Sequence, residues 1–546
     1  MTYWNITIST IFKSIGDSYN TTIIYIKNKV HTITSEIDHN TTYKDFGKHQ
    51  LDFSWISPLK NRLIYKSMLY TQYMIDILLF QKMLFSIFIT YGYYKLTNTH
   101  SPYLIDMLYL DITRNGCIPV KLTQWFMTRF NLITCDKSYF VDKFKNLYEN
   151  CEIHDIEYTK QLFNNTFKEN ILLYSDIPVA SGSIGQVYKG IYKNQIVAIK
   201  VMHPDITNKI FIPKMFFIIY NLILKKLPIL YKYSLPYDLD DFIESIIKQT
   251  DFTIEYANLV KFNELYKDNE LLIFPTPVYA SSQILITSFE DGDFYESSTL
   301  ELSEYKKYKI VLLLTLFIRD SGLINNFIHG DLHMGNWKVK QVGDEYAIVI
   351  YDTGICYSLD INITRDFYLY WEQGDRKNLA KLFRKGIKWH PPHLTLDDIE
   401  LGMYNDITSI TSQPIVVNNI IKRLLKYMNY NHIIIKHEWL NLCVGILLVE
   451  NDIKKYGILR ANTREDYNQT KRDVFKVDFL NYINFCDSNK CFSKLSVYMK
   501  ESLKKENIDF ADLFTNVEYK LNLELDENIE DIIIGHDNTK SITLSI

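Results

Sequence analysis

Apolar residues recur at helical spacing through most of the first 100 residues, and polar clusters at residues 38–40 and 98–99 interrupt them. This pattern predicts a helical N-terminal region with two turns and without recognisable chemistry. The next polar stripe, Lys121, Gln124 and Thr128, recurs at i, i+3 and i+7, so it lies on one face of a further predicted helix. Taken alone, this stripe is typical of the solvated side of an ordinary helix.

The apolar run over residues 73–94 is the best candidate for a transmembrane helix. Asp76, Gln81 and Lys82 interrupt it, whereas a span needs about 20 nearly uninterrupted apolar residues. A second run, residues 211–230, is broken by lysines in the same way. Both runs therefore predict buried or amphipathic helices, and a contact with a membrane surface stays open.

A change from helical to alternating periodicity marks residues 177–201. Two runs rich in β-branched and aromatic residues, 187–192 and 196–201, flank a turn at residues 193–195 and predict a β-hairpin. The loop before it matches the phosphate-binding pattern Gly-x-Gly-x-x-Gly-x-Val with only the first glycine replaced, by alanine. Small residues let backbone N–H groups approach phosphates closely. The predicted nucleotide-binding residues are Ala180, Ser181, Gly182, Ser183, Ile184, Gly185, Val187, Ala198 and Lys200.

Lys200 needs an acidic partner on a helix if it is to contact the α- and β-phosphates of a nucleotide. Apolar residues at helical spacing predict such a helix over residues 251–262, where Glu255 is the chosen partner. Glu244 on the preceding helix is the alternative. Strands are expected at residues 271–274 and 283–287, followed by a hinge at residues 288–292 in which Phe289 would meet the base, and then by a helix at residues 308–320.

The strongest chemical signal is residues 327–354. Asp331 and Asn336 follow a short apolar run, and Asp352 ends a second strand-like run before Thr353 and Gly354. Phosphoryl transfer needs one carboxylate to receive a hydroxyl proton, and an amide with a second carboxylate to hold Mg²⁺. Protein kinases supply these groups as Asp-x-x-x-x-Asn followed by Asp-Phe-Gly. The sequence therefore predicts Asp331 as catalytic and Asn336 with Asp352 as metal ligands; the alternative is a loop whose Asp and Asn cap neighbouring backbone.

Composition narrows the class of protein. The 546 residues are 47% hydrophobic and 23% charged with a net charge of −4, which predicts a globular chain without affinity for nucleic acid. Seven cysteines are dispersed without a Cys-x-x-Cys pair, so a reducing compartment and no zinc site are expected. The N-terminus shows no secretory signal. We therefore expect an intracellular protein that is cytoplasmic or membrane-associated.

These segments together resemble the UbiB/ADCK family of atypical protein-kinase-like proteins. The loop Val-Ala-Ser-Gly-Ser-Ile-Gly-Gln-Val-Tyr is similar to the family's alanine-rich loop, and Asp-Phe-Thr-Ile-Glu-Tyr-Ala-Asn to its Asp-Phe-x-x-Glu-Ala-x-Asn helix. Gly-Asp-Leu-His-Met-Gly-Asn is similar to its Ala-Asp-Pro-His-Pro-Gly-Asn, and the helix at Lys121 to its Lys-x-Gly-Gln segment. The resemblance implies an α+β, protein-kinase-like bilobal fold that binds ATP and Mg²⁺, and an acceptor that is a protein or lipid-related.

Four positions depart from the family pattern. Thr123 stands at a family glycine, Gln249 at a family glutamate, Gly182 at a family alanine and Thr353 at the Phe of Asp-Phe-Gly. We expect these changes to loosen the self-inhibiting cover that the resemblance implies and to favour ATP turnover. A Gly182→Ala variant that phosphorylates itself as well as the wild type does, or better, would contradict this expectation.

Three other activities stay open. A small-molecule kinase of the aminoglycoside or choline type shares the His-Gly-Asp-x-His-x-Gly-Asn style, an ATPase that handles lipids needs no phospho-acceptor, and a pseudokinase scaffold would bind nucleotide only. The predicted domains are a helical region (1–100), a helical family-specific extension (101–176), an N-lobe (177–292), a helical C-lobe (293–515) and an acidic tail (516–546).

Overall fold

The computed structural model describes residues 62–124, 139–145, 147, 151, 153–167, 171–204, 206–226, 239–298, 302, 304–333, 335–372, 375–409, 417–455 and 482–505. Thr128, the turn predicted at residues 38–40 and the acidic tail lie outside these residues. The chain divides into two compact units, the first comprising Met1–Tyr220 with Ser282–Ile286 and the second Asn221–Ser281 with Thr287–Ile546. The domain boundaries predicted from the sequence stay predictions.

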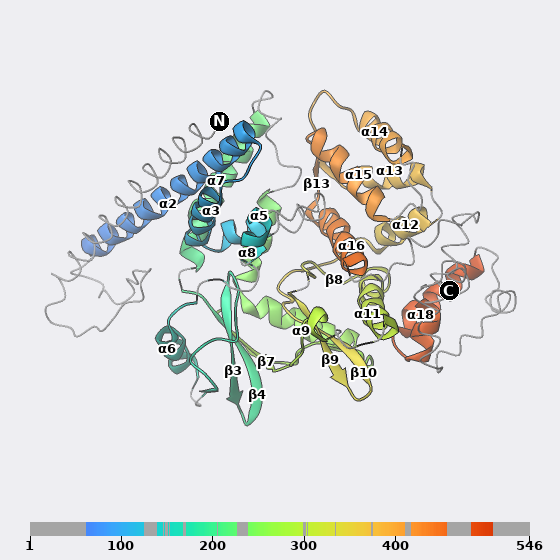
Figure 1. Cartoon of the computed structure of the whole chain (residues 1–546), viewed down its shortest axis with the longest axis horizontal. Helices are drawn as coiled ribbons and strands as arrows, with labels where there is room; N and C mark the ends of the chain where they lie inside the picture. The colour runs from blue at the N-terminus through green and yellow to red at the C-terminus, as the bar shows by residue number, and fades with distance from the viewer. Residues whose placement is uncertain are drawn as a thin grey trace. The chain divides into compact units, whose positions relative to one another are not determined.

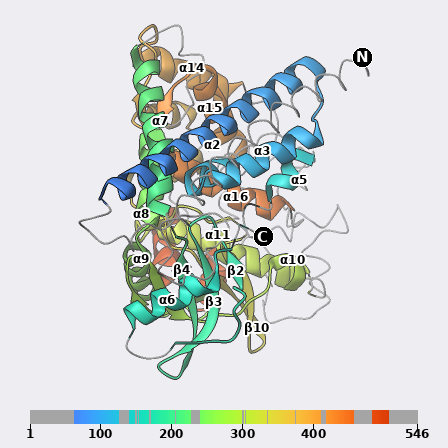
Figure 2. The ribbon, with the colours of Figure 1, turned by 90° about the vertical axis from the view of Figure 1, so that its left-hand side faces the viewer.

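The described part of unit 1 begins with helices that pack on one another. The pair α2 (Arg62–Thr97) and α3 (Pro102–Arg114) lies side by side in both views (Figures 1 and 2), and Asn98 turns the chain between them with a φ of 54°. Ile105, Leu108 and Ile112 of α3 face Phe80 and Met83 of α2 in one buried cluster. The described part of this unit also contains a helix at residues 117–124, α5 (Tyr139–Lys145), α6 (Ile156–Thr166) and the start of α7 (Ile206–Lys226).

The charged residue that interrupts the apolar run of α2 has a buried partner. Lys82 forms an ion pair with Asp111 of α3, and the hydroxyl of Ser86 donates to the same carboxylate. Both charged side chains are almost inaccessible to water. Among the described residues, one helix, Tyr70–Thr97, is long and apolar enough to cross a membrane, and a core helix passes the same test.

The sheet of unit 1 contains the predicted hairpin. Strands β3 (Gly185–Tyr192) and β4 (Gln195–Met202) pair along their whole length, with β1 (Leu172–Leu173) and β2 (Ala180–Ser181) on β3. The turn contains only Lys193 and Asn194, both with positive φ, so Gln195 belongs to β4 rather than to the turn. Two consecutive positive φ values match the right-handed twist of the strands, as in a type I′ turn. Beyond β4 lies β7 (Ile284–Ser288), because Met202 N donates to Gln283 O at 2.9 Å.

The described part of unit 2 is mainly helical and contains three short sheets. Strand β10 (Glu345–Ile350) pairs with β9 (Trp337–Val342) and with β5 (Leu272–Ile273), β8 (Ile328–His329) pairs with β11 (Cys356–Tyr357), and β12 (Ile387–Trp389) pairs with β13 (Ile434–Ile435). Strand β6 (Pro277–Ala280) also belongs to this unit. The helices are α8 (Leu239–Gln249), α9 (Phe252–Leu265), α10 (Tyr295–Ser298), α11 (Glu304–Leu323), α12 (Ile361–Glu372), α13 (Arg376–Arg384), α14 (Leu396–Thr408), α15 (Val417–Tyr430), α16 (His437–Lys455) and α18 (Ser493–Lys505).

Local sequence signals explain where the site-bearing elements begin. The Asp251 side chain accepts a hydrogen bond from Thr253 N at 3.0 Å, so it caps the N-terminus of α9 and fixes its first turn. Helix α11 supplies Leu313, Leu314, Leu316 and Phe317 to the core and leads into β8. The α+β class and the helix and strands predicted around the site are therefore confirmed.

Candidate functional site

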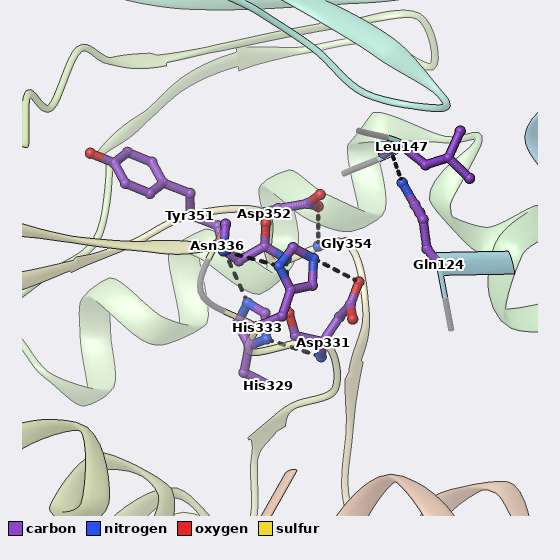
Figure 3. A network of polar contacts seen from close by, with 10 residues as sticks. Gln124, Leu147, His329, Asp331, His333, Asn336, Tyr351, Asp352 and Gly354 are labelled. Atoms are coloured by element: carbon purple, nitrogen blue, oxygen red, sulfur yellow. Dashed lines mark hydrogen bonds and ion pairs between the residues drawn. The ribbon is translucent and has the colours of Figure 1, made fainter. Parts of the chain in front are cut away.

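The loop after β8 folds on itself through the first residue of the predicted acid-amide pair. Asp331 O accepts hydrogen bonds from His333 N at 3.0 Å and from Asn336 Nδ2 at 2.8 Å (Figure 3). Asn336 O in turn accepts from Tyr351 N at 2.9 Å, which joins the loop to the residue before Asp352. Asn336 thus uses its amide nitrogen within the loop, which leaves its side-chain oxygen as the group that can act as a ligand.

The ring of His329 holds the same loop through two hydrogen bonds. Its Nδ1 accepts from Asp331 N at 3.2 Å, so its Nε2 carries the proton and donates to Tyr351 O at 3.1 Å. The ring is buried, and burial lowers its pKa, so the neutral form is maintained. His329 therefore ties Asp331 to the end of β10, a positioning role that the sequence did not reveal.

Asp352 adopts a backbone conformation that is unusual for a residue with a side chain. Its φ is 47°, in the left-handed region, which Asp tolerates better than most residues. The Oδ1 atom accepts from Gly354 N at 3.4 Å. A Cβ added to Gly354 would lie 3.2 Å from Asp352 Oδ1 and 3.8 Å from Glu255 Oε2. Gly354 thus marks the place where these two carboxylates approach one another.

Helix α9 holds this segment through the residue that replaces phenylalanine. The hydroxyl of Thr353 donates to Glu255 O at 3.3 Å, and Asn258 Nδ2 donates to Thr353 O at 2.7 Å. Glu255 is 6% exposed, whereas Glu244 is exposed and lies 3.7 Å from Lys248. The burial of Glu255 beside Asp352 favours it over Glu244 as the functional carboxylate. The role of Asn258 was not anticipated.

The predicted hinge, residues 288–292, is held against the sheet that contains β9 and β10. Tyr351 OH donates to Glu290 O at 3.0 Å, and Lys340 of β9 contacts Glu290 and Asp291, each at 2.9 Å. These two acids hold the pKa of Lys340 above its ordinary value. The chain at Phe289 is therefore anchored on both sides, by Ser288 through the bond from Thr276 N to Ser288 Oγ at 2.8 Å and by Glu290.

In unit 1 the predicted nucleotide loop, residues 180–185, is the tip of the β2–β3 hairpin. Gly182 N donates to Gly185 O at 2.9 Å, so this N–H is engaged inside the loop and is not directed at a ligand, in contrast to the prediction. The hydroxyl of Ser183 is buried and has no hydrogen-bond partner among the described residues. An orphaned hydroxyl at this position fits a bound phosphate oxygen, because an unpaired buried polar group is costly.

The strand residues of the prediction share one face of the sheet. Val187 lies opposite Lys200, and Lys189 lies opposite Ala198, so Val187, Ala198 and Lys200 point to the same side. This side is half-buried, whereas Tyr188, Ile199 and Val201 on the other side are fully buried. Loop and strand residues are thus brought together within unit 1, and Glu255, Asp331, Asn336 and Asp352 within unit 2. The ion pair between Lys200 and Glu255 stays a prediction.

The stripe at Lys121 is not simply a solvated helix face. Gln124 is buried, and its Nε2 donates to Leu147 O at 2.5 Å (Figure 3). Lys121 is half-buried on the same helix, residues 117–124. Gln249 is also buried, and its Cγ lies 3.4 Å from the place where a Cβ on Gly354 would sit. The segment of Gln249 therefore belongs to the surroundings of the predicted site in unit 2.

The two loop glycines should respond differently to a methyl group. A Cβ on Gly185 would lie 2.5 Å from Val201 O, which is backbone of the paired strand, whereas at Gly182 the nearest atom is 3.7 Å away. We expect Gly185→Ala to destabilise unit 1 by about 1–3 kcal/mol and Gly182→Ala to change stability by less than about 0.5 kcal/mol. Hydrogen exchange of the β3–β4 hairpin measures both, and equal protection in the two variants would contradict the expectation.

The residues of this site lie in a segment that matches a known protein family. The family model described as ABC1 atypical kinase-like domain matches residues 146–384. The chain carries a domain of the ABC1 family. The resemblance to UbiB/ADCK proteins and the kinase-like α+β fold that it implies are thereby confirmed. The loop, helix and acid-amide-acid residues all fall inside the ABC1 domain.

Several relatives carry kinase names. The probable serine/threonine-protein kinase abkC of Dictyostelium discoideum is 31% identical over 44% of this chain and 35% of its own length. AarF domain-containing protein kinase 1 of Gallus gallus is 24% identical over 40% of this chain and 43% of its own length. The probable protein kinase UbiB of Histophilus somni is 21% identical over 62% of this chain and 64% of its own length. The chain thus spans less than two thirds of each of these relatives.

Proposed function

We propose that the ABC1 domain of this chain transfers the γ-phosphoryl group of ATP, with Mg²⁺, to a protein or small-molecule acceptor. The observation that carries the proposal is the convergence in unit 2 of a catalytic-loop carboxylate, an amide oxygen and two further carboxylates around the Asp-Thr-Gly segment. Carboxylate and amide oxygens are ligands that Mg²⁺ prefers. The donor set of Asn336 and Asp352 therefore fits this ion, and the orphaned hydroxyl of Ser183 fits a phosphate.

The proposal assigns a role to each residue. Asn336 and Asp352 hold the ion, which neutralises charge on the phosphates when bound. Asp331 receives or orients the proton of the acceptor hydroxyl. The ring of His333 accepts from Gly335 N at Nδ1, so its proton is on Nε2. Nε2 lies 3.8 Å from Asp331 Oδ2, where its N–H can stabilise negative charge next to Asp331. Lys200 contacts the α- and β-phosphates and pairs with Glu255.

Turnover of ATP by the purified chain tests this function. We expect phosphate transfer that requires Mg²⁺ and that Asp331→Asn reduces strongly, because the variant keeps the shape of the side chain and removes its capacity to receive a proton. A panel of peptides, amino alcohols and lipid head groups identifies the acceptor. Phosphate release without any labelled acceptor indicates an ATPase, and stabilisation by ATP without release indicates a scaffold.

An apolar surface of unit 1 supports a further part of the proposal, a contact with a membrane surface. Helices α2 and α7 meet through Tyr73 with Phe211 and through Phe80 with Phe216. Large apolar side chains on both helices remain exposed, among them Met74, Phe85, Phe88, Phe211, Met215 and Ile219. Exposed apolar side chains on adjacent helices are suited to the interface of a lipid bilayer.

Flotation with phosphatidylcholine vesicles tests this contact. Phe88 is 73% exposed on α2, and we expect Phe88→Asp to reduce the bound fraction severalfold, because a charge at the interface opposes insertion. Tyr430→Asp is the matched control, since Tyr430 is 83% exposed at the end of α15. Equal binding of both variants would contradict the contact, and so would a wild-type chain that stays with the lipid-free fraction.

A further inference from the structure

A continuous chain of polar side chains leads from the core of unit 1 to the tip of the nucleotide loop. Its members are Gln186 and Tyr188 of β3, Thr159 of α6, His154 and His203. It ends on the loop itself, where His203 Nε2 lies 2.9 Å from Gly182 O. The activity proposed above assigns no role to any of these five side chains.

Gln186 fixes the direction of the first link. Its Oε1 accepts from His154 N at 2.9 Å and its Nε2 donates to His154 O at 3.2 Å, so the orientation of its amide is determined. The same Nε2 donates to Tyr188 OH. Tyr188 OH lies 3.3 Å from Thr159 Oγ1, and because the Tyr188 oxygen accepts from Gln186, its own proton can be donated to Thr159.

The hydrogen bonds then continue through both histidines. Thr159 Oγ1 lies 2.8 Å from His154 Nε2, and His154 Nδ1 lies 2.8 Å from His203 Nδ1. With Tyr188 donating to it, Thr159 can give its own proton to His154 Nε2. In that arrangement the proton of neutral His154 is on Nδ1 and is donated to His203 Nδ1. Neutral His203 then carries its proton on Nε2.

The other end of the chain requires the same arrangement. Gly182 O can only accept, so His203 Nε2 must donate to it. The contact with Gly182 O thus requires the tautomers that the Tyr188 end allows, with both rings neutral. Burial, and then the neighbouring His203, lower the pKa of His154 to about 3, which agrees with a neutral ring. A charged His203 would reverse the donors between His203 Nδ1 and Thr159 and would leave one hydroxyl proton, that of Thr159 or of Tyr188, without an acceptor among these five side chains, because Gln186 Nε2 can only donate.

His203 holds the loop tip at two peptide groups. Its backbone N–H donates to Ile184 O at 2.9 Å, and its ring donates to Gly182 O. In a trans peptide the carbonyl and the following N–H point in opposite directions. Turning these two carbonyls toward His203 therefore turns the N–H groups of Ser183 and Gly185 away from it. Both N–H groups belong to residues of the predicted nucleotide loop.

We propose that His203 is a positioning residue that presents the N–H groups of Ser183 and Gly185 to phosphate, and that the chain from Gln186 through His154 locks the required tautomer. The inference rests on the proposed function for the identity of the ligand. The orientation of the loop can be tested without nucleotide. The expected loss is that of one buried hydrogen bond, which corresponds to a factor of about three to ten in affinity.

Nitrogen NMR of the full chain labelled at histidine tests the tautomers directly. We expect His203 as the Nε2–H form and His154 as the Nδ1–H form at pH 7. Thr159→Val removes the hydroxyl that contacts His154 Nε2, so only the contact with Gly182 O still favours these tautomers, and the other forms of both rings should become populated. Thr166→Val is the matched control, since Thr166 lies on the same helix and its hydroxyl donates to Leu162 O at 2.7 Å. The opposite tautomers, or a charged ring at pH 7, would overturn the inference.

Nucleotide affinity separates positioning from folding. We expect His203→Ala and Thr159→Val to raise the KM for ATP about three- to tenfold with kcat changed less than twofold, and His203→Gln, which keeps an N–H donor, to recover part of the loss. Unchanged KM in His203→Ala would overturn the positioning role. If the wild-type chain binds no ATP, the proposed function fails, whereas faster amide exchange at Ser183 and Gly185 in His203→Ala still supports the loop orientation.

Discussion

Asp352→Asn is expected to lower the turnover of ATP by about 10²–10³-fold, a loss of the size seen when one preorganised charge-stabilising group is removed. The substitution changes charge and little else. Asn tolerates the left-handed conformation that Asp352 adopts, with its φ of 47°, so the backbone at the end of β10 should be preserved. The amide can still accept from Gly354 N. The loss of turnover would then report the missing metal-binding carboxylate rather than a misfolded loop.

The control for this variant lies on the same hairpin. Asp344 stands in the turn between β9 and β10, is exposed, and lies outside the site, so Asp344→Asn should retain wild-type turnover. Steady-state phosphate release at several Mg²⁺ concentrations compares the three proteins. Raised Mg²⁺ should restore part of the activity of Asp352→Asn if its defect is metal affinity. A variant that keeps more than half of the wild-type rate would show that Asp352 is not a ligand.

The sequence predicted the parts of this site whose chemistry depends on local order. Spacing alone placed Asp331, Asn336 and Asp352 around a strand, and alternation alone located the β3–β4 hairpin. Such signals are readable because turn and strand preferences act within a few residues. The sequence analysis named Glu255 and kept Glu244 as the alternative, and no local signal separates the two, since the difference depends on which face of each helix is buried.

The features that the sequence did not reveal depend on contacts between distant segments. His329 reads as part of a motif, yet its role follows from the carbonyl of Tyr351, 22 residues later. In the sequence Gln186 is one residue of the loop motif. Its role is visible only in the structure, where it contacts His154, 32 residues earlier. The hydroxyl of Thr353 looked like a departure from the kinase pattern, but in the structure it binds α9. No periodicity predicts such pairings.

The buried ion pair of unit 1 should be decisive for its stability. Lys82→Met removes the ammonium that neutralises the buried carboxylate of Asp111 and leaves Ser86 as its hydrogen-bond donor among the described residues. Removing one partner of a buried pair costs about 3–5 kcal/mol. Hydrogen exchange of peptides from α2 and α3 should therefore show a large loss of protection, while peptides from α14 keep the wild-type rate and serve as the internal control.

The double variant Lys82→Met with Asp111→Leu separates charge from packing. Replacing a whole buried pair by apolar residues of similar volume is often neutral or stabilising, so we expect the double variant to recover most of the protection that Lys82→Met loses. Such a recovery means that the cost lies in the unpaired carboxylate and not in the lost side-chain volume. If the double variant were as unstable as the single one, the contact of Lys82 with Asp111 would be a packing constraint between α2 and α3, and its charge would be incidental.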